Sequence, residues 1–147
     1  MNALRLTMGA TAGKDRLDGG WWPYSRDLSI ELVDLVDSFP SRYGRILRAT
    51  CSAPDWEDAP RRVAVQGRTI KVGRFRRDET HVIHLTTSDR AVYRLLVIPS
   101  TFDEAQGSEA LLASATHGNR HSAADLLSAV TNELPVDPAG QWADGGQ

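Results

Sequence analysis

The residues best suited to bind a charged ligand form one run between positions 61 and 77. The run contains seven basic residues and no acidic residue. The basic residues are Arg61, Arg62, Arg68, Lys71, Arg74, Arg76 and Arg77. The centre of the run, Gln66-Gly67, is typical of a two-residue hairpin turn, which would set Val63 opposite Ile70 and Arg62 opposite Lys71. The apolar pair would then face the core and the like-charged pair would face solvent.

Like charges that face each other across two strands destabilise a sheet, so this pair needs a counter-charge. One source is the protein itself, because the segment 27–37 carries four carboxylates at helical spacing and the loop 55–58 carries three more. The other source is an external anion such as phosphate, bound by Arg62, Lys71 and Arg74. A nucleic acid held by the whole 61–77 hairpin is a further form of this second alternative, and the sequence leaves both sources open.

A second candidate ligand site is the run LDGGWWPYSRDL at residues 17–28, which we term the aromatic segment. Two glycines that can adopt positive φ and a following proline predict a bent loop, neither a helix nor a regular strand. Its rings would either pin this loop against a sheet or stack on a flat ligand or a nucleobase. The contact residues would be Trp21, Trp22, Tyr24 and Arg26. Because adjacent side chains of an extended chain point to opposite faces, we expect at least one of the two tryptophans to be partly exposed.

The remaining polar residues indicate neither metal binding nor a known type of catalysis. His81 and His84 are three residues apart in a predicted strand and would point to opposite faces, while Gly118-Asn119 breaks the helical spacing of His117 and His121. The sequence contains no phosphate-binding loop, dinucleotide-binding glycine pattern or nucleophile-elbow motif. We therefore expect no metal site and no cofactor, with the catalytic residues of any activity unknown.

Periodicity predicts an α+β fold that would position these residues. The predicted strands are 4–8, 45–51, 61–66, 69–75, 81–86 and 92–98. A first helix is predicted from about 27 to 39, a second from a capping box at Thr101 and Glu104 to about 115, and a third from Ser122 onward. Since the strands between 45 and 98 have short connections, we expect a twisted antiparallel sheet of five to six strands, packed by one N-terminal and two C-terminal helices.

Composition bounds the class of protein. The 147 residues are 41% hydrophobic and 24% charged, which is typical of a globular chain, and we expect a single domain at 1–134 with a flexible C-terminal tail at 135–147. The net charge of −2 gives no overall attraction to nucleic acid or acidic membranes. The single cysteine, Cys51, lies in a predicted strand and should be a buried, inert thiol. The lack of a signal peptide and of a long apolar run predicts a cytoplasmic protein that does not enter a membrane.

Three motifs resemble a family of short, mostly actinobacterial proteins that is catalogued only as a domain of unknown function. They are LDGGWWPYSRDL, APRRVAVQGRTIKVGRF and GNRHSAADLL, and the likeness spans roughly residues 4–130. The resemblance implies no activity and transfers no functional residue. We therefore expect a small binding or regulatory module that acts through a protein partner or an anionic ligand. A nucleic-acid binder and, with less support, a small enzyme are the alternatives.

Overall fold

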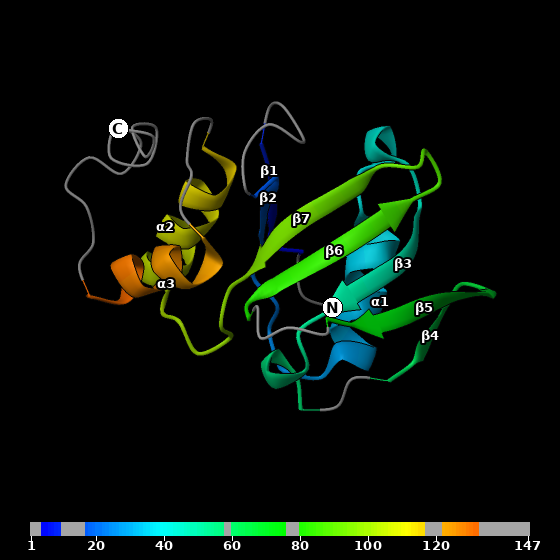
Figure 1. The fold of residues 1–147 in the computed structure, drawn as a ribbon, viewed down its shortest axis with the longest axis horizontal. Coiled ribbons are helices and arrows are strands. Elements are labelled where there is room, and N and C mark those ends of the chain that lie inside the picture. The colour runs from blue at the N-terminus through cyan, green and yellow to red at the C-terminus, as the bar shows by residue number, and fades with distance from the viewer. Residues whose placement is uncertain (1–3, 10–16, 58–59, 76–79, 117–121, 133–147) are drawn as a thin grey trace.

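The computed structural model of the chain describes residues 4–9, 17–57, 60–75, 80–116 and 122–132, which form a mixed α+β fold (Figure 1). Its strands are β1 (Leu6–Met8), β2 (Gly19–Trp21), β3 (Ile46–Cys51), β4 (Arg62–Val65), β5 (Arg68–Arg74), β6 (Val82–Thr87) and β7 (Val92–Val97). Its α-helices are α1 (Leu28–Ser38), α2 (Glu104–Ala115) and α3 (Ala123–Asn132), with short 3₁₀ turns η1 (Ser41–Tyr43) and η2 (Ala53–Asp55). The predicted tail at 135–147 lies outside the described residues.

The seven described strands form one sheet in the order β1-β2-β7-β6-β3-β5-β4. The pairs β2/β7 and β3/β5 are parallel and the other four pairs are antiparallel. The predicted α+β class with one N-terminal and two C-terminal helices is confirmed, but the sheet is mixed where an antiparallel one was predicted, and it has seven described strands where five to six were predicted. The prediction assumed that strands joined by short loops are neighbours, whereas β5 lies between its hairpin partner β4 and the more distant β3.

The additional strand comes from the aromatic segment, where a bent loop was predicted. Neither Gly19 nor Gly20 has positive φ in this strand. Both glycines are instead required by close packing: a Cβ on Gly19 would lie 2.1 Å from the carbonyl oxygen of Thr7, and a Cβ on Gly20 would lie 2.3 Å from Oγ of Ser114. The glycines thus allow a neighbouring strand and a helix to approach the backbone of β2, which is a common use of glycine within strands.

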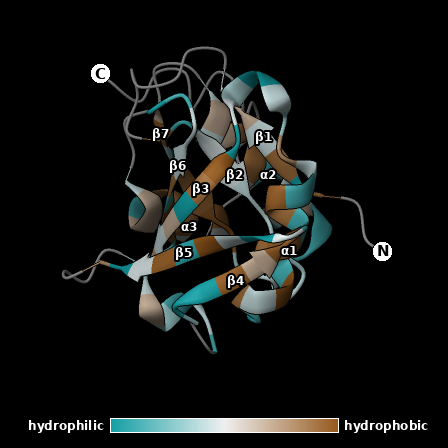
Figure 2. Ribbon diagram, turned by 90° about the vertical axis from the view of Figure 1, so that its right-hand side faces the viewer, coloured by the Kyte–Doolittle hydropathy of each residue, from teal (hydrophilic) through white to brown (hydrophobic). Residues whose placement is uncertain are grey.

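The sheet separates two hydrophobic clusters. Successive residues of β7 and its end alternate between them, because side chains of a strand point to opposite faces. Leu95 and Val97 belong to the cluster that includes the apolar side of α1, and Leu96 and Ile98 belong to the cluster formed with α2 and α3. In Figure 2, apolar and polar residues alternate along β5.

The helices cover the two faces unequally. α1 contacts β4 on one face, whereas α2 contacts β1 and β2 on the other and α3 packs on α2 (Figure 1). At the β3-β5-β4 end, the face opposite α1 carries exposed side chains, among them Arg48, Arg62, Ala64, Thr69 and Lys71. We call this part of the sheet the outer face.

Side-chain hydrogen bonds define where two of the helices begin. α2 starts two residues later than predicted, because its capping box is formed by Asp103 and Gln106, not by Thr101 and Glu104. α3 begins as predicted, with the backbone N–H of Asp125 donating to Oγ of Ser122 at 3.2 Å. None of the helices in the described part of the chain is long and apolar enough to span a membrane.

Candidate functional site

Three basic side chains stand side by side across the outer face. The register pairs Arg62 with Lys71, as the sequence predicted, and pairs Lys71 in turn with Arg48 on β3. Directly paired residues point to the same face, so one residue from each of three neighbouring strands forms a row. We call Arg48, Lys71 and Arg62 the cationic row. The hairpin turn is also as predicted, with Gln66 at φ 48° and Gly67 at φ 80°.

The described carboxylates do not neutralise this row. Within the described residues, no carboxylate forms an ion pair with Arg48, Arg62 or Lys71. The acidic groups offered by the sequence are used elsewhere. Glu31 of α1 accepts hydrogen bonds from the backbone of Tyr24 at 2.9 Å and from Oγ of Ser25 at 2.8 Å, Asp37 accepts from Gln66, and Asp55 pairs with His81. The reason is geometric, since α1 packs on the face opposite the cationic row.

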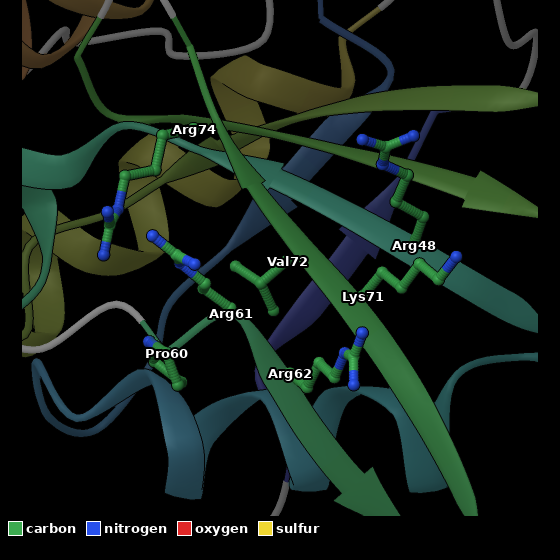
Figure 3. A pocket seen from close by; sticks show the side chains of 7 residues that line it. All are labelled: Arg48, Pro60, Arg61, Arg62, Lys71, Val72 and Arg74. Carbon is green, nitrogen blue, oxygen red and sulfur yellow. The ribbon is translucent and has the colours of Figure 1, made fainter.

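The row borders a hollow of about 780 Å³ at the end of β4 (Figure 3). Its lining residues are Arg48, Pro60, Arg61, Arg62, Lys71, Val72 and Arg74. We call this feature the basic hollow. Beside the hollow, the backbone N–H of Val72 donates to the carbonyl of Arg61 at 2.8 Å, which holds the start of β4 against β5. Gly73 leaves space beside the row: a Cβ there would lie 3.7 Å from a guanidinium nitrogen of Arg48.

The electrostatics of the basic hollow favour an anion. Two unit charges about 5 Å apart repel each other by about 0.8 kcal/mol in water and by more where solvent is partly excluded. In the cationic row, Arg48 with Lys71 and Lys71 with Arg62 start from neighbouring strands, one strand spacing of about 4.8 Å apart, so their charges repel each other. An anion placed between them would remove this repulsion, and each arginine offers a planar fork that matches phosphate or carboxylate oxygens. Basic side chains in this arrangement supply the positive charge and the hydrogen-bond donors that a multiply charged anion requires.

The two tryptophans of the aromatic segment are both buried. Trp21 is 1% exposed and lies in the cluster with α1, its ring centroid 5.5 Å from that of Trp56. Trp22 is 3% exposed, lies in the other cluster, and donates from Nε1 to the carbonyl of Pro99 at 3.1 Å. They point to opposite faces as predicted, but the expectation that one would be partly exposed is wrong. With a helix packed on each side of the sheet, both faces of β2 are interior.

The other two predicted contact residues of the aromatic segment also have partners within the chain. Tyr24 is 39% exposed, and the guanidinium of Arg5 lies between its ring and that of Trp22, 3.7 Å from each centroid. Arg26 donates to the carbonyls of Pro54 and Asp55 at 2.9 and 3.2 Å. Of the seven predicted ligand-binding residues, Arg62, Lys71 and Arg74 line the basic hollow, although Arg74 pairs with the buried Cys51 and starts from the opposite side of β5 to Lys71. The four from the aromatic segment contact other parts of the chain.

Sequence reasoning missed Arg48, which completes the cationic row, and Asp55 with His81. Arg48 could not have been found without the parallel pairing of β3 with β5. His81 has a left-handed backbone, with φ 63°, and lies just before β6 instead of inside it. In the described part of the chain, no group of three or more His, Cys, Asp and Glu side chains could hold a metal ion. Arg76, Arg77, His117 and His121 lie outside the described residues.

Cys51 is fully buried on β3, as predicted, beside Arg74 of β5. Burial raises the pKa of its thiol from 9.0 to about 11, and the nearby Arg74 opposes this shift in part. A thiol whose pKa is raised by an apolar environment contains little of the reactive thiolate at neutral pH. Cys51 is therefore a packing residue of the sheet.

Comparison with known proteins gives a family but no function. A search of curated proteins and a search of solved structures each found no significant match. A comparison with profiles of protein families matches residues 4–114, which include the aromatic segment and the basic hairpin. This match covers most of the chain, and the protein therefore belongs to the family of unknown function DUF5994.

Proposed function

We propose that this protein is a cytoplasmic binding module that holds a phosphate-bearing ligand in the basic hollow. The observation that carries the proposal is the cationic row, in which Arg48, Lys71 and Arg62 are adjacent and exposed and form no ion pair with a described carboxylate. A fold that keeps three like charges in register bears a repulsive cost. Binding of an anion would remove this cost.

The shape of the site favours a ligand with more than one negative charge. Neighbouring strands lie about 4.8 Å apart, so the outer members of the row start about 10 Å from each other. A ligand with several phosphate groups matches this spacing, and Arg61 and Arg74 extend the positive lining around the end of β4. Arginine forks then orient the phosphates, while Lys71 contributes a compact charge at the centre of the row.

A single-stranded nucleic acid is the second candidate for the same phosphate chemistry. It is favoured by an aromatic pair at the end of β5, where the ring of Phe75 meets the ring of His84 at 4.7 Å between centroids. Nucleic acids that lie across open sheet faces combine backbone contacts to basic residues with bases stacked on such rings. A small polyphosphate would use the cationic row alone.

The test compares two probes and two double variants. The probes are fluorescein-labelled oligothymidylate, measured by anisotropy, and inorganic tripolyphosphate, measured by calorimetry. We expect Arg62→Glu/Lys71→Glu to lose binding, because it reverses two of the three charges of the row. The control is Arg42→Glu/Arg45→Glu, which changes the net charge by the same amount at two exposed arginines outside the basic hollow. This control should bind as the wild type does.

Salt dependence separates specific from general attraction. If the row neutralises about three phosphates, the slope of log K against log salt should be near −2, or a loss of about 15- to 20-fold from ~50 to ~200 mM salt. Binding of the oligonucleotide but not of tripolyphosphate would identify a nucleic-acid binder, and the opposite result would identify a small-anion binder. Equal weakening by the control variant, or no binding of either probe, would refute the proposal.

A further inference from the structure

A second cavity, separate from the basic hollow, lies between the aromatic segment and the end of β7. Its volume is about 250 Å³, and it shares no lining residue with the basic hollow. Most of its wall is apolar and consists of Pro23, Pro54, Trp56, Val97, Ile98 and Pro99. Cavities that bind small molecules commonly combine such apolar walls with a few fixed polar groups. A cavity of about 150 Å³ already accepts benzene, so this one has room for a single substituted ring.

The most constrained polar group of the cavity is His81. The carboxylate of Asp55 accepts a hydrogen bond from the backbone N–H of His81 at 2.7 Å, and its other oxygen lies 3.6 Å from Nδ1 of the ring. The side chain of Asp55 is only 3% exposed, and Arg26 holds the backbone of the same turn through two carbonyls. The ring contact is longer than a hydrogen bond, so the carboxylate acts on the imidazole through its nearby negative charge, which favours the proton on Nδ1.

This arrangement leaves the second ring nitrogen of His81 directed away from the carboxylate. Nε2 has no hydrogen-bond partner among the described residues, and neither do the hydroxyl groups of Ser100 and Thr101, which also line the cavity. With the proton on Nδ1, Nε2 is a hydrogen-bond acceptor. His81, Ser100 and Thr101 all line the cavity, and these residue types can present to it one ring acceptor and two hydroxyl donors.

Two further departures from ordinary packing occur at the same cavity. Nε1 of Trp56 is buried without a partner among the described residues, although an unpaired buried N–H costs about 1–3 kcal/mol. His81 adopts φ 63°, a left-handed conformation found in a few per cent of non-glycine residues, among which histidine is enriched. Unpaired polar groups and strained backbone gather at functional sites more often than elsewhere.

We propose that this cavity binds a small aromatic or aliphatic alcohol, whose hydroxyl group donates a hydrogen bond to Nε2 of His81. The apolar body of the ligand packs against the three prolines and the Trp56 ring, and the ligand oxygen accepts from Ser100 or Thr101. Asp55 is a positioning residue, since it acts on the ligand only through the tautomer and orientation of His81.

The test uses two probes that differ in one hydrogen-bond donor, phenol and its methyl ether anisole. Binding is followed by NMR through the indole N–H signal of Trp56, which is identified by its loss in Trp56→Phe. Ligands of this size reach affinities on the order of 1 mM. We expect phenol to bind about 5- to 10-fold more tightly than anisole, which corresponds to one hydrogen bond.

Three variants locate the source of this preference. His81→Ala should make the two affinities equal, and Asp55→Asn should reduce the preference because an amide no longer fixes the proton on Nδ1. The control His84→Ala, at a histidine that does not line the cavity, should keep the preference unchanged. Equal affinities in the wild type, a preference that survives in folded His81→Ala, or no shift of the Trp56 signal with either probe would each overturn the proposal.

Discussion

The aromatic segment and the basic hollow differ in how completely the protein itself satisfies their side chains. In the aromatic segment, Trp22 has a hydrogen-bond acceptor and a cation on its ring, and Arg26 has two carbonyl partners. In the basic hollow, Arg48, Arg62 and Lys71 form no ion pair with a described carboxylate. Groups with internal partners stabilise the fold, and charges held without them are available to a ligand. Whether a side chain stabilises the fold or is available to a ligand thus depends on its contacts in the structure, which residue types alone do not reveal.

Truncation of either tryptophan should have the largest effect on the free energy of unfolding, and it tests whether the aromatic segment belongs to the core. Trp21→Ala and Trp22→Ala should each lower the free energy of unfolding by about 3–5 kcal/mol, since each removes a buried indole. Urea denaturation measures the loss. Tyr24→Ala is the matched control, because that ring is 39% exposed and its truncation should cost about 1 kcal/mol or less. Losses below about 1 kcal/mol for both tryptophans would show that the aromatic segment is not part of the core.

A smaller effect is expected where a helix touches the aromatic segment. Gly107 of α2 packs against Trp22 so closely that a Cβ would lie 2.2 Å from the ring. Gly107→Ala should therefore destabilise by about 1–3 kcal/mol, whereas the same change in an open helix would stabilise by about 1 kcal/mol. A Cβ added at Gly73 would lie 3.7 Å from its nearest neighbouring atom, which is an ordinary contact distance. Gly73→Ala should therefore be close to neutral in the same denaturation assay. A stabilising Gly107→Ala would contradict the packing described for Trp22.

Cys51 lies at the boundary between the core and the basic hollow, because it is a buried residue whose neighbour on β5, Arg74, lines the hollow. Burial raises the pKa of its thiol from 9.0 to about 11. The folded state therefore holds the thiol proton more tightly than the unfolded state. The resulting contribution to the free energy of unfolding is fully present below pH 9 and is lost as the pH rises through 11. About 1 kcal/mol should be lost between about pH 7 and about pH 10, and this loss should be absent from Cys51→Ala.

The measurement is the difference in unfolding free energy between wild type and Cys51→Ala at the two pH values. Taking the difference removes the contributions of other groups that ionise in alkali. A thiol reagent provides an independent check, because it should label the native protein only slowly at neutral pH. Rapid labelling would show that Cys51 is accessible and that its environment is not the apolar one described.

Reversal of the hairpin charges has the smallest expected effect on folding, and its sign is informative. Arg62→Glu/Lys71→Glu should change the unfolding free energy by about 0.5 kcal/mol or less, because exposed pairs contribute little. The change should be neutral or stabilising at low salt, since Arg48 would then face a glutamate, and it should shrink as salt is added. Thermal unfolding at two salt concentrations provides the measurement. A clear destabilisation would mean that the two residues have internal carboxylate partners.

Much of the secondary structure could be predicted from the sequence. The strands between 45 and 98 and the Arg62–Lys71 register follow from local patterns: alternation of polar and apolar residues, and a two-residue turn. The parallel pairs could not be predicted, because the alternation of residues within a strand does not determine which other strand it pairs with. The sequence therefore predicted two members of the cationic row, Arg62 and Lys71, but not the third, because Arg48 joins the row through the parallel β3/β5 pairing.

The aromatic segment was misjudged for a related reason. Asp18-Gly19-Gly20 was interpreted through the conformational freedom of glycine, although the glycines of β2 are required by what lies beside them. Burial of Trp22 depends on α2, which is more than eighty residues away along the chain. Asp55 and His81 pair across 26 residues of sequence, and neither residue has a local pattern that indicates the other.

The position of β2 in the sheet determines the order in which the chain can be assembled during its synthesis. β1 pairs with β2, and β2 is joined to the rest of the sheet only through β7, which ends at Val97. A ribosome therefore releases residues 6–21 long before it releases the strand that they need. β3, β4, β5 and β6 can pair with one another in that interval, whereas β1 and β2 can pair only with each other until β7 is available. β1 and β2 are thus among the last strands to join the sheet, and closure of this long loop is the slow step that we expect for the domain.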